Sequence, residues 1–586
     1  MSNYEVVVGI DFGSSGTGFA YSFFNENKIL TGEIYGASAN NKIPTEIILD
    51  NNNYTVQFGS ECEKFLKEKG IDAGHYFKGI KMHLYENKNT IIASNSGKEI
   101  SLKIVIQRVL EKIKEIAIKQ ISQNRPSLAK EQDKIKWIVT VPAIWDERQK
   151  GIMMESCEAA GLINQNTDKS LFFALEHEAA SLYCSRNKEI EQKYFQNGEY
   201  YIVCDLGGGT GDIVAHLVGS NHKLAEISPS CGGNFGSNEI DKLIFKEIIQ
   251  QLFGCPDFNT YYYKLKKNNA NDTKFIDDKG QYYSDWMEFE RKIKEFKEDA
   301  KPDHIKNNEK STIDCSIFKE IFADNIELDE LVKEYNDNIS YDNLKLSVRK
   351  NKYKWLVEFP YNIIYYYMER QAQSICKIIN DISANEKIHT LIFVGGYCSN
   401  DIITNLIETG LKNISTILRP SNPNLAVMEG AVLFGIKPSN IIIRKAKYTI
   451  GSNINEICDN NKINMDDNYK YYDEDKKKWF YKDCFDKYIE VDQEIKFGEL
   501  ISHEISMTDK RYLELYFFKT KKKNPKYINE EGVIQIGKFV LDIGKDYEKS
   551  DERKVKVTMK FGGTFIDVTA IHLKTRITAK SSYNFD

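Results

Sequence analysis

The chain has 586 residues, which is too long for a single hydrophobic core and predicts about four domains or subdomains. Its formal net charge is −5 and its isoelectric point is near 6.1. Hydrophobic residues make up 41% and charged residues 28%, as in ordinary globular proteins, and the acidic excess argues against a nucleic-acid-binding protein. Neither a membrane span nor a signal peptide is evident and the 11 cysteines are scattered, so we expect a cytoplasmic protein with free thiols.

The first predicted element is a β-hairpin closed by glycines. Residues 6–12 form a continuous apolar run around Asp11, typical of a buried strand, and residues 19–24 resume as a second strand. The turn between them reads Gly-Ser-Ser-Gly. Because glycines expose backbone N–H groups without side-chain obstruction, the turn predicts a phosphate-binding loop.

Three further elements are expected before residue 190, where we place the end of a first lobe. A helix is predicted over about 101–123, a buried strand over 137–142, and a second helix over about 148–160. Gly161 directly follows that helix, in the place where a C-terminal cap favours glycine.

A second glycine hairpin opens at residue 201 and repeats the design of the first. Its strand reaches Asp205, passes through a Gly-Gly-Gly-Thr turn and resumes over 213–218. Strand rather than helix follows the glycines in both hairpins, which argues against a dinucleotide fingerprint and against a P-loop. The repeated motif predicts one nucleotide cleft between two related lobes.

The remaining chain divides into three expected parts. We predict a second lobe over 191–390, with a polar peripheral insertion of little apolar periodicity at about 255–350. A return segment over 391–437 holds a glycine-ended strand and a helix at 425–434, in which Gly430 permits close packing. Residues 438–586 predict a β-rich domain, with strands over 512–518, 533–543, 555–561 and 564–571.

Seven motifs in this order resemble the seventy-kilodalton heat-shock proteins, in the actin, sugar-kinase and heat-shock ATPase superfamily, and especially their divergent member-twelve-like branch. The resemblance covers residues 5–436 well and 438–586 loosely. It implies an α/β fold, in which two ribonuclease-H-like lobes form a duplicated actin-like ATPase, followed by a small β-rich domain. The motifs occupy 11–16, 139–143, 175–180, 205–210, 232–237 with Asp241, 393–396, and 423–431.

The resemblance implies that ATP or ADP binds between the hairpins with Mg²⁺, which keeps most of its waters. Asp11 and Asp205 would flank the metal, Thr210 and Asp212 would lie near the γ-phosphate, and Glu176 would orient the attacking water. A first-lobe lysine would face the γ-phosphate, and Lys81 is preferred over Lys78. The phosphates would be held by Gly13, Ser14, Ser15, Gly207, Gly208, Gly209 and Thr210.

The adenosine side follows the family pattern less closely. Glu290 and Lys294 share one helical face and stand where the family carries a Glu-x-x-Lys-Arg helix. Tyr397 replaces the usual arginine after the glycines, and its ring is the candidate for stacking on adenine. The implied cofactor contacts on this side are Gly236, Glu290, Lys294, Gly395, Gly396 and Tyr397.

The linker and the β-rich domain depart further from the family. The linker at 440–445 is apolar but basic, whereas the family has an acidic, leucine-rich segment. The β-domain looks shortened and has no counterpart of the helical lid and the acidic tail. We therefore expect it to hold a different client or one fixed partner.

Three function classes follow from these observations. The leading hypothesis is a monomeric chaperone whose slow Mg²⁺-dependent ATPase controls the β-domain, with an unknown protein client or co-chaperone and neither nucleic acid nor membrane as partner. A nucleotide-binding scaffold with weak or lost hydrolysis is the second. A metabolite kinase is the third, and it lacks a clear sugar motif in the second lobe.

Overall fold

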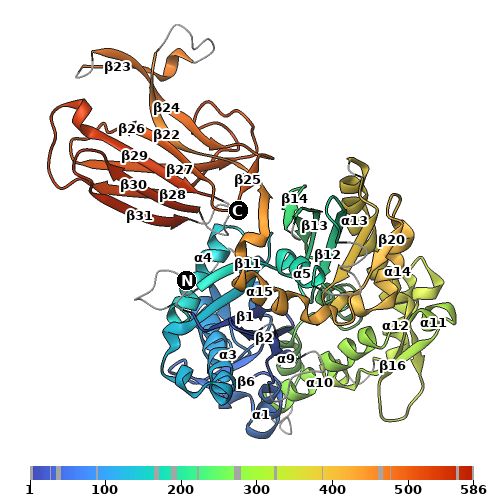
Figure 1. Cartoon of the computed structure of the whole chain (residues 1–586). Helices are drawn as coiled ribbons and strands as arrows, with labels where there is room; N and C mark the ends of the chain where they lie inside the picture. The colour runs from blue at the N-terminus through green and yellow to red at the C-terminus, as the bar shows by residue number, and fades with distance from the viewer. Residues whose placement is uncertain are drawn as a thin grey trace.

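The computed structural model describes residues 4–26, 28–34, 41–86, 90–163, 171–186, 195–220, 223–269, 279–322, 326–385, 387–458, 466–474, 477–561 and 566–583. Over these residues the chain is a mixed α/β protein with several sheets (Figure 1). No helix within the described ranges is long and apolar enough to cross a bilayer.

The first sheet has the strand order β11-β10-β1-β2-β3, with β4 also paired to β2. The predicted first hairpin is confirmed, since β1 and β2 pair antiparallel through the glycine turn. Strand β10 lies parallel to β1, and every residue of both is buried, which explains their continuous apolar sequences. The strands span Val6–Phe12 (β1), Gly16–Phe23 (β2), Leu30–Thr31 (β3), Ile43–Pro44 (β4), Ile135–Val141 (β10) and Leu171–Leu175 (β11).

The second sheet has the order β20-β19-β12-β13-β14-β21-β25, with β15 also paired to β13. Strands β12 and β13 form the second predicted hairpin, and β19 lies parallel to β12 as β10 does to β1. The first five strands of this path therefore repeat the order of the first sheet. The bounds are Tyr200–Leu206 (β12), Gly211–Val218 (β13), Leu224–Glu226 (β14), Cys231–Gly233 (β15), Thr390–Val394 (β19), Thr416–Leu418 (β20), Ile441–Lys445 (β21) and Glu494–Lys496 (β25).

Helix α15 (Ala426–Ile436) packs against α5 (Glu176–Cys184) and against β1. A Cβ added to Gly430 would lie 1.8 Å from the carbonyl oxygen of Ala179, so the predicted close packing at Gly430 is confirmed. The two predicted first-lobe helices are also confirmed as α3 (Leu102–Asn124) and α4 (Glu147–Ala159). Gly161 has a φ of 70° after α4, as expected of a C-terminal glycine.

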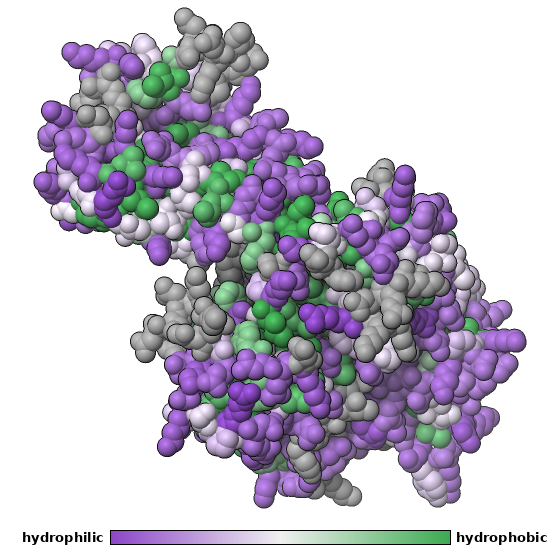
Figure 2. Space-filling model, in the orientation of Figure 1, coloured by the Kyte–Doolittle hydropathy of each residue, from purple (hydrophilic) through white to green (hydrophobic). Residues whose placement is uncertain are grey.

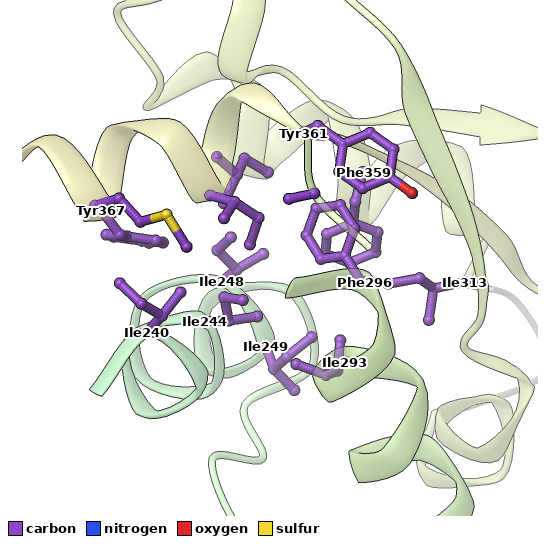
Figure 3. Close-up of a cluster of buried hydrophobic side chains, with 14 of the residues drawn as sticks. Ile240, Ile244, Ile248, Ile249, Ile293, Phe296, Ile313, Phe359, Tyr361 and Tyr367 are labelled. Atoms are coloured by element: carbon purple, nitrogen blue, oxygen red, sulfur yellow. The ribbon is translucent and has the colours of Figure 1, made fainter. Parts of the chain in front are cut away.

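The segment predicted as a polar insertion contains α9 (Phe258–Asn268), α10 (Lys279–Glu298), α11 (Pro302–Lys306), β16 (Lys310–Asp314), α12 (Leu328–Asp337) and β17 (Ser347–Arg349). The prediction of little apolar periodicity is wrong for α10, which buries Tyr283, Trp286, Met287, Ile293 and Phe296. Figure 3 shows Ile293 and Phe296 facing isoleucines of the helix that runs through α7 (Asn238–Leu243), a π-helix (Ile244–Ile249) and α8 (Gln250–Phe253). The insertion thus has an aromatic and aliphatic core continuous with the second sheet.

The C-terminal strands form two antiparallel sheets, ordered β23-β24-β22-β27-β28 and β26-β29-β30-β31. The four strands predicted there are confirmed as β27 (Tyr512–Thr520), β28 (Ile534–Asp542), β29 (Lys554–Lys560) and β30 (Ile566–His572). Buried and exposed residues alternate along β29, as expected when one face covers a core. The others are β22 (Thr449–Ile457), β23 (Lys470–Asp473), β24 (Lys478–Ile489), β26 (Leu500–Ser506) and β31 (Thr578–Tyr583).

In Figure 1 these two sheets, orange to red, stand apart from the blue and green part of the chain. Strands β21 and β25 lie within the predicted β-rich range, yet both belong to the second sheet. On the face drawn in Figure 2, hydrophilic side chains cover most of both parts, and hydrophobic groups form small separate clusters.

The remaining elements are α1 (Glu61–Lys69), α2 (Ile80–Glu86), β5 (Ile47–Leu49), β6 (Thr55–Phe58), β7 (His75–Phe77), β8 (Ile91–Ala93), β9 (Glu99–Ser101), β18 (Leu356–Pro360), α13 (Asn362–Asn385) and α14 (Asp401–Gly410).

Candidate functional site

A cavity of about 640 Å³ lies where the two hairpins meet, and we call it the cleft. Its lining brings together nearly all the residues predicted from the motifs, although they come from both sheets and from distant parts of the chain. They are Asp11, Gly13, Ser14, Ser15, Lys81, Glu176, Asp205, Gly207, Gly208, Gly209, Thr210, Asp212, Lys294, Gly395, Gly396 and Tyr397. Gly236 and Glu290 are the predicted residues outside this lining.

The two glycine turns approach each other closely. A Cβ at Gly208 would lie 1.9 Å from Ser15 Oγ, and a Cβ at Gly209 would lie 2.3 Å from Ser14 Oγ. A side chain at either position would force the facing serine to move, and the two glycines present backbone instead. Gly236 supports this arrangement from behind, since its own Cβ would lie 2.4 Å from the carbonyl oxygen of Gly208.

Four buried carboxylates surround the cleft: Asp11 at the end of β1, Asp205 and Asp212 facing each other across β12 and β13, and Glu176 at the start of α5. Burial raises the pKa of Asp212 to about 6 and that of Glu176 to about 7, and it raises the pKa of Asp205 well above its usual value. Neighbouring carboxylates add to the effect at Glu176 and Asp205. Such a group of acids favours any cation or proton that reaches it.

One of these carboxylates has an oxygen without a hydrogen-bond partner in the part of the chain that the structure describes. Asp212 Oδ1 is buried and has no hydrogen-bond partner among the described residues. Buried polar atoms are nearly always paired in proteins, so this oxygen fits a site completed by a bound group or by water. No cluster of three or more His, Cys, Asp or Glu able to hold a metal occurs in the described ranges.

The structure separates the two candidate lysines. Lys81 is buried on α2 and donates from Nζ to Glu176 Oε1 at 2.5 Å, inside the cleft. Lys78 instead forms an ion pair with Glu290. The geometry therefore favours Lys81 as the lysine that faces a ligand.

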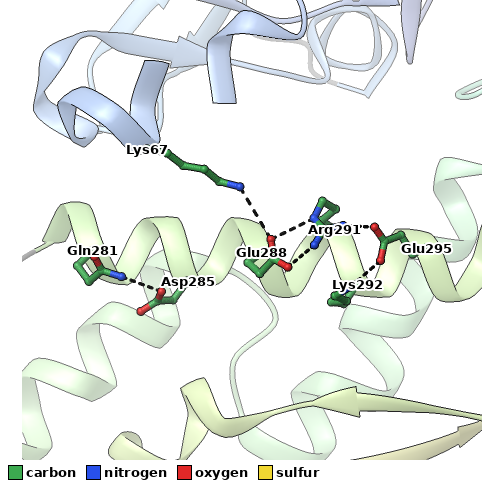
Figure 4. A network of polar contacts seen from close by, with 7 residues as sticks. All are labelled: Lys67, Gln281, Asp285, Glu288, Arg291, Lys292 and Glu295. Atoms are coloured by element: carbon green, nitrogen blue, oxygen red, sulfur yellow. Dashed lines mark hydrogen bonds and ion pairs between the residues drawn. The ribbon is translucent and has the colours of Figure 1, made fainter. Parts of the chain in front are cut away.

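Glu290 occupies a different place from the one expected. It accepts hydrogen bonds from Lys78 and from Trp286 Nε1, the latter at 2.9 Å, and does not line the cleft. The pair joins α10 to the segment just before α2. Figure 4 shows a neighbouring link, in which Lys67 of α1 reaches Glu288 of α10 at 3.9 Å, beside a network around Arg291.

Tyr397 lines the cleft but is only 5% exposed, and its hydroxyl donates to Gln371 Oε1 at 2.9 Å. Little of its ring faces the cavity, so stacking on a base stays a prediction. Gly395 has a φ of 85°, and a Cβ there would lie 2.4 Å from Asp205 Oδ1. Glycine at 395 therefore allows the end of β19 to approach the carboxylate.

Several lining residues were not predicted. Lys42 Nζ lies 2.6 Å from Asp11 Oδ2, Ser15 Oγ donates to Asn238 Oδ1 at 3.2 Å, and Lys297 pairs with Asp241 at 2.5 Å. No glycine motif marks Lys42 or Asn238. Lys297 had a signal, because it lies one helical turn after Lys294 on α10.

Comparisons with known proteins give matches over the whole chain, although no protein-family model matches it. Heat shock 70 kDa protein 12A of Mus musculus is 24% identical over 99% of this chain and 92% of its own length. Heat shock 70 kDa protein 12B of Homo sapiens is 23% identical over the full chain and 91% of its own length. A chaperone protein HscA homolog of Rickettsia africae is 24% identical over 42% of this chain and 38% of its own.

The two full-length matches extend beyond the motifs into the C-terminal sheets. They agree with the resemblance inferred from the order of the glycine hairpins and the strands between them. Over its whole length the chain is thus similar to 70-kDa heat-shock proteins of the kind represented by members 12A and 12B.

Proposed function

We propose that this protein binds ATP and ADP with Mg²⁺ in the cleft and hydrolyses ATP slowly, as a heat-shock-like chaperone. The observation that carries the proposal is the meeting of two glycine turns and four buried carboxylates around one cavity. Glycine turns suit a phosphate chain, and the carboxylates suit the cation that accompanies it.

The fold supports the same proposal. The shared strand order of the two sheets, with α5 and α15 packed between them, is what a duplicated actin-like ATPase of two lobes would have. Chaperone proteins of the HscA type also match part of the chain. The nucleotide would then lie between the halves, where opening and closing can respond to its phosphates.

The residues of the cleft fit a magnesium-bound nucleotide. Asp11 and Asp205 would hold the ion, largely through water, and the orphaned Asp212 Oδ1 would accept from a water near the γ-phosphate. When bound, Mg²⁺ would neutralise phosphate charge. Lys81 would add a positive charge opposite the γ-phosphate, and Glu176, held by Lys81, would orient a water for attack.

Contacts of β21 and of Lys447 with β14, α5 and the residues after β10 support control of the β-region by the cleft. Strand β21 pairs with β14, and Arg444 on β21 donates to both carboxylate oxygens of Glu178 at 2.6 Å. Glu178 lies two residues after Glu176 on α5. Lys447 then donates to the carbonyl oxygen of Ala143, just beyond β10, at 2.5 Å.

We infer that the protein works as a cytoplasmic monomer on a protein client or co-chaperone. The second candidate function is a scaffold that binds nucleotide without hydrolysing it. It is favoured by the buried ring of Tyr397, in the place of the arginine that would grip adenosine.

Isothermal titration calorimetry with Mg-ATP and Mg-ADP tests the proposal, with phosphate release as the second readout. The wild type is expected to bind both nucleotides, and Asp205→Ala to weaken binding by up to about tenfold, since it removes a charged partner of the metal. Asp337→Ala, an exposed carboxylate at the end of α12, is the control. Folded wild type that gives no heat with either nucleotide would overturn the proposal, and binding without phosphate release would select the scaffold.

A further inference from the structure

Lys42 enters the cleft from the residue just before the short strand β4, in a segment that carries no recognisable motif. It follows Asn41, which has a φ of 55°, and precedes β4, whose Pro44 lies opposite Gly16 of β2. A left-handed residue followed by strand pairing sets the path of the backbone at this point. Lys42 is thus placed by the first sheet itself.

The stem of Lys42 lies on bare backbone of β2. A Cβ at Gly18 would lie 3.1 Å from Lys42 Cγ, and a Cβ at Gly16 would lie 3.2 Å from Lys42 Cβ. Two glycines on the strand therefore leave the space in which the aliphatic part of the lysine packs. Such packing directs the ammonium group toward the end of β1.

The ammonium group reaches Asp11. Lys42 Nζ donates to Asp11 Oδ2 at 2.6 Å, while Thr140 Oγ1 donates to Asp11 Oδ1 at 3.4 Å, so both oxygens have protein donors. The Lys42 side chain is 22% exposed and that of Asp11 is 6% exposed. The lysine also lines the cavity, so its charge faces both the carboxylate and whatever occupies the cleft.

We propose that Lys42 is a built-in counter-ion of Asp11, a positioning residue that makes nucleotide binding less dependent on a divalent cation. This inference rests on the proposed nucleotide site. A triphosphate without metal is repelled by a bare carboxylate beside it, and an ammonium group on that carboxylate removes the repulsion. A divalent cation therefore has less negative charge to neutralise at Asp11 in this protein.

The test is the ratio of ATP dissociation constants measured in EDTA and in excess Mg²⁺, using a fluorescent ATP analogue and calorimetry. In the wild type the ratio is expected to stay within about tenfold. Lys42→Gln is expected to raise it by about tenfold, mainly by weakening metal-free binding, because a charge-assisted contact is lost. Lys42→Arg keeps the charge and is expected to keep the wild-type ratio.

Lys103→Gln is the matched control, because it breaks another lysine–carboxylate pair, with Glu155 at 2.9 Å, away from the cleft. Thermal melts of each variant show that it is folded. Equal weakening of Lys42→Gln in both conditions, or a wild type as metal-dependent as the variant, would overturn the inference while leaving the nucleotide site intact. A folded wild type that binds nothing in Mg²⁺ would remove the proposed function, and this inference with it.

Discussion

The cleft and the junction where β21 meets the second sheet both bury charge, but they satisfy it differently. At the junction, which we define as Glu178, Glu226, Arg444 and Lys447, the guanidinium of Arg444 makes two hydrogen bonds to Glu178, with side chains 8% and 1% exposed. In the cleft, Asp212 Oδ1 stays unpaired beside an open cavity.

The contrast separates a structural use of buried charge from a binding use. A buried ion pair joined by two hydrogen bonds fixes how two elements meet, and removing one partner leaves an uncompensated charge. A buried carboxylate with an unpaired oxygen retains the free-energy cost of burying that oxygen, and only a ligand, a water or a proton lowers this cost. Changes at the junction should therefore act on stability, and changes in the cleft should act on binding.

Breaking the junction should give the largest effect. Arg444→Ala leaves Glu178 buried without its main partner, so the free energy of unfolding is expected to fall by about 3–5 kcal/mol. Urea denaturation followed by circular dichroism measures it. Lys445→Ala is the control, because it breaks the partly exposed ion pair with Glu494. It should lower the free energy of unfolding by less than about 1 kcal/mol. Equal losses in the two variants would remove the contrast.

A pH series sharpens the comparison at Glu226, which faces Lys447, Arg444 and Glu178. Burial raises its pKa from 4.5 to about 7 despite Lys447 and Arg444. The folded state then binds more protons than the unfolded state between these values, so stability falls as pH rises from about 4.5 to 7. Glu226→Gln should remove on the order of 2 kcal/mol of that fall.

Urea midpoints at pH 5 and pH 7.5 for the wild type and Glu226→Gln test this expectation. The buried acids of the cleft titrate in the same direction, so the variant keeps part of the wild-type dependence. An unchanged difference between the two pH values in the variant would show that Glu226 is already ionised in the folded protein.

The smallest effect is expected at Lys78, whose pair with Glu290 is 46% and 31% exposed. Exposed ion pairs contribute about 0–1 kcal/mol, so Lys78→Met should leave the free energy of unfolding nearly unchanged. Because the pair joins α10 to the segment before α2, its loss should speed nucleotide release by about two- to fivefold. Stopped-flow displacement of a fluorescent nucleotide measures the rate, with Lys69→Met at the end of α1 as control. A loss of several kcal/mol in stability would contradict the expectation for an exposed ion pair.

Elements with strong local patterns were predictable. The hairpins at 6–24 and 201–218 were predicted from apolar strands around glycine turns. Helices α3 and α4 were predicted from their periodicity and, for α4, from the glycine that follows it. Strands β27–β30 were predicted from alternating apolar and polar residues or from β-branched and aromatic residues. The polar reading of α10 failed because its charged residues, paired with one another on the outer face, masked the buried aromatic positions.

The residues of the cleft also divide into those that local motifs predicted and those that they did not. Glycines and aspartates of the turns were predictable, because each motif shows its chemistry within a few residues. Lys42 and Asn238 were not, since their partners lie 31 and 223 residues away in the chain, and the helical spacing that pointed to Lys297 did not reveal its partner Asp241, 56 residues away. The place of Glu290 was also missed, because its partner Lys78 comes from the other side of the cleft.

By itself the sequence determined the kind of loop, the strands that carry it and the heat-shock resemblance, because glycine conformations and apolar patterning act over short distances. Only the tertiary structure decided which charges meet. Lys81 rather than Lys78 faces the cleft, β21 joins the second sheet, and Arg444 pairs with Glu178, since these contacts depend on how the two sheets and α5 are packed.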